Sequence, residues 1–146
     1  MAQPKARVLL AAVLAVGLVA AAPAQAQAPH LSQAQKIKLM SPKAYAAMKV
    51  ESKWLNPKRE FKCLHDLWMK ESNWRPNAHN KSSGAFGIAQ FLPSTWGNYK
   101  FPFKPKDPQI QIDAGLRYIY KRYGTPCNAW AFWKKKAGPD LHGGWY

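Results

Sequence analysis

The stretch of sequence that decides the fold is Cys63–Gln90, CLHDLWMKESNWRPNAHNKSSGAFGIAQ. It begins with an apolar segment of helical spacing that ends at Glu71 and Ser72, and it closes with a glycine-punctuated segment. Trp74 and Pro76 end the helical pattern, because the residue before a proline disfavours helical backbone. The stretch therefore predicts a helix, a sharp polar turn, and a return segment that lies close to the end of the helix.

Glu71 continues the apolar face of this predicted helix. Leu64, Leu67 and Trp68 precede it at helical spacing, so the four side chains share one face. Apolar neighbours, the negative end of the helix dipole and the lack of Lys or Arg at i−3 and i−4 all raise the pKa of a carboxyl group. The pattern predicts an acid that stays protonated near neutral pH, as a general acid requires. A partly exposed glutamate at a helix end, without chemistry, is the alternative.

Further helices are predicted on both sides of this stretch, because a capping residue followed by proline is typical of a helix start. The predicted helices cover residues 32–40, 42–53, 57–72, 93–96, 108–123 and 126–135. Residues 85–91 are expected to form a short strand or an irregular loop. The sequence predicts a mainly α, single compact helical domain with at most a small β-hairpin or irregular loop in the middle.

The first 26 residues have the layout of a secretory signal peptide. Lys5 and Arg7 precede an uncharged apolar run over Val8–Ala22, and Ala-Gln-Ala at residues 24–26 is a small-x-small cleavage site. The run is shorter than the roughly 20 residues of a membrane span, although an uncleaved anchor is the alternative. We expect a signal peptide at 1–26, an N-terminal lead at 27–40 and the functional domain at 41–146. The expected location is secreted, periplasmic or in the cell wall.

Cys63 and Cys127 are the two cysteines of the chain. In an oxidising compartment an even pair usually forms a disulfide bond, and two buried free thiols are the alternative. The two cysteines and four scattered histidines lack the spacing of metal ligands, so neither a metal nor another cofactor is expected.

The formal net charge of +15 favours polyanionic surroundings. For an exported protein these are anionic wall polymers or lipids. Nucleic acid is not expected, because the sequence contains no recognised nucleic-acid-reading module. A basic surface that only aids solubility is the alternative.

The motif around Glu71 resembles the lytic transglycosylases of the goose-type lysozyme superfamily. In that family a Glu-Ser pair is followed by G-A-x-G-[LI]-x-Q, and here Glu71 and Ser72 are followed by GAFGIAQ at residues 84–90. The segment AGLRYI at 114–119 is similar to the later G-x-x-Y-[LI] helix of the family. Cys63, Cys127 and the terminal Gly-Trp-Tyr are similar to small exported members of actinobacterial type. The resemblance covers roughly residues 45–146 and implies an α+β lysozyme-like transglycosylase domain.

The resemblance also implies an activity, the cleavage of peptidoglycan glycan strands at the β-1,4 bond between N-acetylmuramic acid and N-acetylglucosamine. Glu71 is then the catalytic general acid/base, and the muramyl 6-hydroxyl closes a 1,6-anhydro ring without water. The expected substrate-binding residues are Ser72, Gln90, Tyr118, Trp96 and Trp130. No clear second carboxylate accompanies Glu71, whereas ordinary glycosidases use two; an intramolecular hydroxyl nucleophile removes that need.

The chain departs from the family pattern at two places. Many members carry A-Y-N where residues 129–131 read Ala-Trp-Ala, and the Met of many G-L-M-Q motifs is Ala89 here. Two other functions stay open, a hydrolytic muramidase on the same fold and a non-catalytic cationic cell-wall-binding protein. The muramidase would place a water near Glu71, steered by an acid such as Asp113. A monomer is expected.

Overall fold

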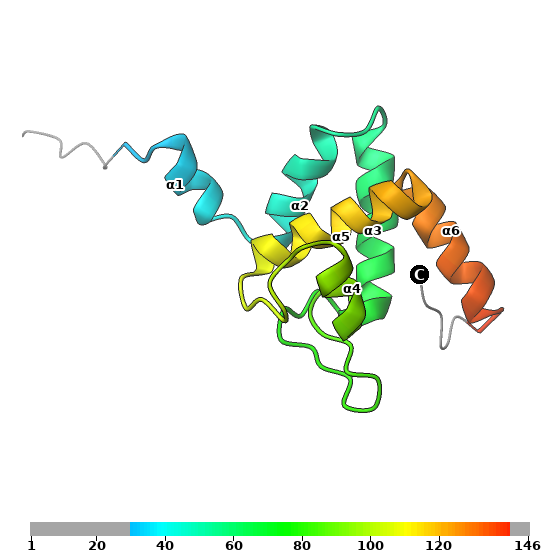
Figure 1. The fold of residues 1–146 in the computed structure, drawn as a ribbon. Coiled ribbons are helices and arrows are strands. Elements are labelled where there is room, and N and C mark those ends of the chain that lie inside the picture. Colours follow the sequence, from blue (N-terminus) through cyan, green and yellow to red (C-terminus); the bar gives the residue numbers. More distant parts are fainter. Residues whose placement is uncertain (1–29, 141–146) are drawn as a thin grey trace, which may run out of the picture. The chain divides into compact units, whose positions relative to one another are not determined.

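Six α-helices joined by loops make up the part of the chain that the computed structural model describes, residues 30–140 (Figure 1). They are α1 (Gln33–Lys38), α2 (Pro42–Glu51), α3 (Pro57–Ser72), α4 (Pro93–Asn98), α5 (Pro108–Tyr123) and α6 (Pro126–Ala137). Proline occupies the start of α2 to α6, where its missing N–H costs no helical hydrogen bond. The predicted mainly helical fold is confirmed.

Helix α3 supplies the centre of the hydrophobic core. Its side chains Leu64, Leu67 and Trp68 are fully buried, and it packs against α2 and α6. Helix α5 approaches the same face, as Gly115 shows: a Cβ at Gly115 would lie 2.6 Å from the ring of Trp68. A larger residue at that position would push α5 away from α3. The predicted apolar stripe is therefore the face on which the domain assembles.

The segment between α3 and α5 contains no regular sheet within the described residues. Two isolated antiparallel bridges, His79–Phe86 and Phe86–Phe91, are its only strand pairing. This agrees with the small hairpin or irregular loop that the sequence predicts.

The buried side chain of Gln111 on α5 holds this segment in place. Its Nε2 donates to the carbonyls of Pro76 at 2.9 Å and Pro105 at 2.7 Å. Its Oε1 accepts the backbone N–H of Ile88 at 2.8 Å. Gly87 has φ +84°, and a Cβ there would lie 2.5 Å from Gln111 Oε1, so glycine is required on both steric and conformational grounds. One amide thus fixes three points of a long loop to α5.

The start of α6 is joined to α3 by two contacts. Cys63 and Cys127 form the predicted disulfide bond. One turn from Cys63, the buried carboxylate of Glu60 accepts the backbone N–H of Cys127 at 2.8 Å. A carboxylate at a helix N-terminus is favoured by the helix dipole. Together the two contacts fix the position of α6 beside the helix that carries Glu71.

The N-terminal part of the described chain carries α1, which lies in the expected N-terminal lead. Ser32 and Gln35 form a capping box at its start, and Gln109 Nε2 of α5 donates to Ile37 O at 2.9 Å. No helix among residues 30–140 is both long and apolar enough to cross a membrane. The predicted signal peptide at 1–26 and the terminal Gly-Trp-Tyr at 144–146 lie outside the described residues.

Candidate active site

Glu71 lies in the last turn of α3, where the chain reverses sharply. Asn73 and Trp74 both have left-handed backbone, with φ of 55° and 59°. The N–H of Trp74 reaches back to the carbonyl of Trp68 at 3.3 Å, and that of Asn73 to Met69 at 3.0 Å. The bond from Asn73 to Met69, with Asn73 in left-handed backbone, is the pattern of an αL helix end. Left-handed backbone is strained in a bulky residue such as Trp74, and here it turns the chain back beside the acid.

Ser72 joins the end of α3 to the return segment. Its buried Oγ donates to the carbonyl of Ile88 at 2.7 Å. The backbone N–H of Ile88 is bound by Gln111, so this part of the GAFGIAQ segment is held from both sides. The structure therefore brings together the Glu71-Ser72 pair and residues 84–90, which lie more than ten positions apart in the sequence.

The carboxyl group of Glu71 is poorly solvated. Its Oε1 is buried and has no hydrogen-bond partner among the described residues. Burial raises the pKa of Glu71 to about 8, because a low-dielectric surrounding disfavours the anion. The indole of Trp133 offsets part of this rise. No charged side chain contributes to the shift. The protonated acid that the sequence predicts is thus what the geometry favours at neutral pH.

Trp133 is the α6 residue that faces this carboxyl. It is 3% exposed, and its indole N–H completes no hydrogen bond within residues 30–140. It interacts with Glu71 without reaching hydrogen-bond geometry. Two buried polar groups that face each other without good partners are costly. Such an arrangement is expected where a polar ligand completes the network.

Trp130 and Tyr118, two of the predicted substrate-binding residues, lie on different helices. Trp130 is half-buried and stacks on Trp133, with 5.2 Å between the ring centroids. Trp130 therefore lies beside the indole that faces Glu71. Tyr118 is buried on α5 and packs against Phe91 and Tyr99. Burial raises its pKa. Their contacts with a substrate stay predictions.

Gln90 and Trp96 occupy positions that already have structural partners. Gln90 has φ 49°, and its Nε2 donates to Gly87 O at 2.8 Å and to Ala78 O at 3.2 Å. Trp96 is only 1% exposed and packs edge-on against Phe91 at 5.0 Å. A sugar could stack on the Trp96 ring only after a rearrangement of the loop. In this conformation Gln90 binds two carbonyls within the loop, and Trp96 packs α4 against the return segment.

Asp113, the acid considered as a partner for Glu71, is engaged elsewhere. Its carboxylate accepts the hydroxyl of Tyr45 at 3.0 Å and pairs with Lys49 Nζ at 3.0 Å. It lines a cleft between α2 and α5, and none of the predicted site residues lines that cleft. Among residues 30–140, no group of three or more His, Cys, Asp or Glu side chains is arranged to hold a metal ion.

Reasoning from sequence missed two positioning side chains, Gln111 and Glu60, which fix the loop and α6. It considered Trp133 only as an aromatic that could stack on a sugar, and not as the neighbour of the acid. The spacing of Trp130 and Trp133 on one helix, three residues from each other, was the signal for Trp133. For Gln111 the signal was a polar side chain within an apolar helical stripe.

A family model, the Transglycosylase SLT domain, matches residues 56–134, which is more than half of the chain and runs from the start of α3 into α6. The match and the helical site around one acid define a lysozyme-like protein that acts on peptidoglycan. The chain belongs to the Transglycosylase SLT domain family. Searches of curated proteins and of solved structures found no match. A cell-wall location is consistent with the family and with the disulfide bond.

Proposed function

We propose that this protein is a peptidoglycan lytic transglycosylase that cleaves the β-1,4 bond between N-acetylmuramic acid and N-acetylglucosamine. The observation that carries the proposal is Glu71, whose Oε1 is buried, whose pKa is raised to about 8, and on which no charged side chain acts. A hydrolase with two carboxylates needs a second acid across the scissile bond. Among the described residues, no second acid contributes to the pKa shift of Glu71, which favours a reaction that uses one carboxyl group.

The proton of Glu71 serves both halves of the reaction. In the first, Glu71 donates it to the bridging oxygen, and the bond from that oxygen to C1 of the muramic acid breaks. In the second, the Glu71 carboxylate accepts the proton of the muramyl 6-hydroxyl while that oxygen bonds to C1. The acid is regenerated, no water is consumed, and the new chain end is a 1,6-anhydro ring.

A raised pKa suits both steps. At pH 7 an acid of pKa about 8 is mostly protonated, so the enzyme is ready to donate. Its conjugate base is also a stronger base than an ordinary carboxylate, which helps it to deprotonate a hydroxyl. The intramolecular 6-hydroxyl replaces a positioned water and its activating base.

The neighbouring side chains have positioning roles in this proposal. The Ser72–Ile88 hydrogen bond keeps the return segment against the acid. The half-buried Trp130, stacked on Trp133, offers a ring face to a sugar. The indole N–H of Trp133, which completes no hydrogen bond within the described chain, is a donor for a substrate oxygen near the scissile bond.

The test is mass spectrometry of the muropeptides released from purified peptidoglycan sacculi. Wild-type protein is expected to release products with 1,6-anhydro ends, which are lighter by one water than reducing ends. Glu71→Gln is expected to release almost none. The matched control is Asp113→Asn, which also neutralises one acid but leaves the product pattern unchanged. Products with reducing muramic ends would identify a hydrolytic muramidase instead.

A further inference from the structure

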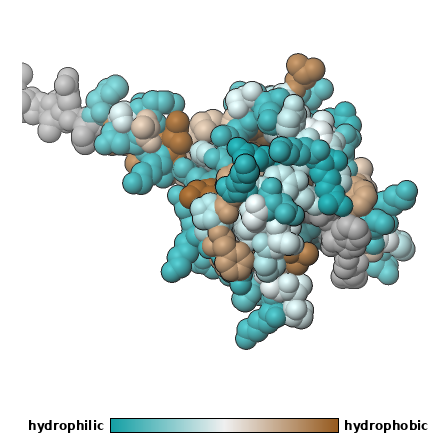
Figure 2. Space-filling model, in the orientation of Figure 1, coloured by the Kyte–Doolittle hydropathy of each residue, from teal (hydrophilic) through white to brown (hydrophobic). Residues whose placement is uncertain are grey.

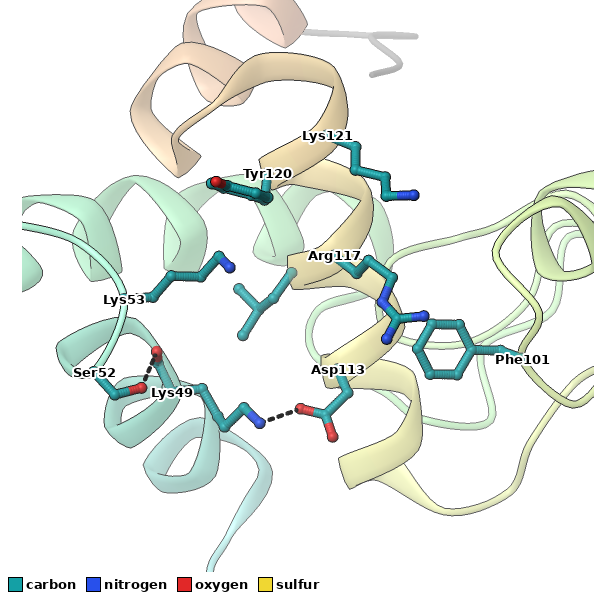
Figure 3. Close-up of a pocket in the computed structure, with 9 residues that line it drawn as sticks. Lys49, Ser52, Lys53, Phe101, Asp113, Arg117, Tyr120 and Lys121 are labelled. Carbon is teal, nitrogen blue, oxygen red and sulfur yellow. Dashed lines mark hydrogen bonds and ion pairs between the residues drawn. The ribbon is translucent and has the colours of Figure 1, made fainter.

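A cleft of about 700 Å³ lies between α2 and α5, apart from the Glu71 site. Figure 3 shows how the side chains of the two helices converge on it, with Phe101 from the connecting loop on one side. Its cationic lining residues are Lys49, Lys53, Arg117 and Lys121. Figure 2 shows that the face over α5 is largely hydrophilic. A concave surface with this lining favours a negatively charged ligand.

The lining contains one carboxylate, Asp113, against four cations. The carboxylate of Asp113 already forms an ion pair with Lys49 Nζ at 3.0 Å and accepts a hydrogen bond from the hydroxyl of Tyr45. Among the described residues, Lys53, Arg117 and Lys121 form no ion pair. Their like charges repel one another across the cleft, and an anion bound between them relieves that repulsion.

Each of these three cations makes a cation–π contact with an aromatic ring. Lys53 Nζ lies 3.8 Å from the ring centroid of Tyr120. The guanidinium of Arg117 lies 5.0 Å from the ring of Phe101, and Lys121 Nζ lies 5.8 Å from the ring of Tyr99. Cation–π contacts hold a charged group in place without neutralising it. The cleft therefore keeps its positive charges positioned and available to a ligand.

We propose that this cleft binds a phosphodiester-linked anionic polymer of the cell wall. Phosphate accepts the forked donors of Arg117 and the point charges of Lys53 and Lys121 at the same time. A polymer with one charge in each repeat meets several of these cations together and releases their counterions. The C–H faces of its polyol or sugar units fit Tyr120, which is 55% exposed. That the polymer belongs to the wall rests on the proposed function.

Binding at this cleft holds the enzyme on the wall through a surface that shares no residue with the catalytic site. None of Glu71, Ser72, Trp130 and Trp133 lines the cleft. Retention and catalysis are therefore expected to be separable by mutation.

The first experiment measures binding of the protein to soluble poly(glycerol phosphate), by fluorescence anisotropy at several NaCl concentrations. The double variant Arg117→Gln/Lys121→Gln is expected to bind about tenfold more weakly at low salt, with the slope of log Kd against log[NaCl] reduced by about 1.4. The matched control is Lys36→Gln/Lys58→Gln, which removes two exposed cations outside the cleft and is expected to bind nearly as the parent does. Arg117 and Lys121 are exposed, so circular dichroism should show both variants folded.

Four outcomes would overturn the proposal. An equal loss in the two double variants would mean that only overall charge matters. Equal affinity for poly-glutamate of matched charge would exclude a preference for phosphodiesters. Tighter binding to phosphatidylglycerol vesicles would identify a membrane surface as the occupant, and displacement of the polymer by free muropeptides would assign the cleft to peptide stems.

A second experiment separates this proposal from the proposed function. Lysis rates are compared on sacculi before and after extraction of their phosphodiester polymers. Arg117→Gln/Lys121→Gln is expected to lyse intact walls more slowly than wild type, and extracted sacculi at the wild-type rate. Glu71→Gln is expected to bind poly(glycerol phosphate) normally. A cleft variant that is equally slow on extracted sacculi would overturn the retention role, whereas loss of anhydro products would concern the catalytic proposal alone.

Discussion

Glu71 and Asp113 are two carboxylates of one helical domain with opposite surroundings. Glu71 ends α3 with a buried oxygen that has no hydrogen-bond partner within the described chain, and burial raises its pKa to about 8. Asp113 has a side chain that is 36% exposed and meets a cation and a phenol hydroxyl. Its presence raises the pKa of Lys49, mainly through their hydrogen bond. The surroundings of Glu71 therefore suit the proposed proton transfer, whereas those of Asp113 suit an ion pair.

The difference between the surroundings of Glu71 and Asp113 also fits the proposed reaction, which uses one acid. Four cations line the α2–α5 cleft together with Asp113, whereas no charged side chain contributes to the pKa shift of Glu71. The protein is therefore strongly basic overall, and yet its positive charges do not lower the pKa of Glu71.

The largest expected effect is the loss of activity in Glu71→Gln. Removal of a general acid typically costs at least about 100-fold in rate, because the leaving oxygen must then depart without a proton. The measurement is the release of soluble muropeptides from sacculi at pH 6 to 7. Residual activity within threefold of wild type would exclude Glu71 as the acid.

The same substitution is expected to stabilise the fold at alkaline pH. In the unfolded chain the carboxyl group, with an ordinary pKa of 4.5, releases its proton as the pH rises, while the native one with pKa about 8 keeps it. Native stability therefore falls between about pH 4.5 and 8. Gln removes this loss, a gain of roughly 2 kcal/mol at pH 8 after allowance for burying an amide.

The check is urea denaturation of wild type and Glu71→Gln at pH 4 and at pH 8. The gain should be present at pH 8 and absent at pH 4, since both states of wild type are protonated there. Equal differences at the two pH values would show that the effect is packing rather than proton release.

A third prediction concerns the pH dependence of catalysis. Activity needs the protonated form of Glu71, so kcat/KM should fall about tenfold for each pH unit above the pKa of about 8. Initial rates on solubilised glycan strands between pH 5 and 10 give the profile. A decline that begins near pH 5 would mean that Glu71 has the pKa of an ordinary carboxyl group, and activity that rises with pH through this range would mean that it acts as its anion.

The smallest effect is expected for Asp113→Asn. The Lys49–Asp113 pair is more than one third exposed on both sides, and pairs of this kind contribute less than about 1 kcal/mol. Thermal unfolding should move by a few degrees at most, and the product pattern should not change. A loss of lysis as large as that of Glu71→Gln would make Asp113 a second catalytic carboxylate.

The helices and the state of the acid could be predicted because they depend on local patterns. Pairs such as Ser41 with Pro42 and Asp107 with Pro108 mark helix starts, and the stripe ending in Glu71 already implies burial. The expected sugar contact of Trp96 illustrates the limit. Its 1% exposure follows from how α4 packs on the return segment, which an aromatic residue type does not encode.

The contacts that complete the site depend on tertiary packing. Trp133 meets Glu71 only because α6 is fixed beside α3 by Cys127 and Glu60. The cationic cleft exists only where α2 approaches α5, so its lysines are indistinguishable in the sequence from other surface charges. A contact between residues that lie far apart in the sequence produces no periodic pattern from which it could be predicted.

The fit between Gly87 and Gln111 has a consequence for how this sequence can diverge. A Cβ at Gly87 would strike the amide oxygen that holds Ile88, and a shorter residue at position 111 would release the carbonyls of Pro76 and Pro105. Neither position can change alone without loosening the segment that Ser72 anchors. A substitution at one of these two positions is therefore expected to be tolerated only together with a compensating substitution at the other.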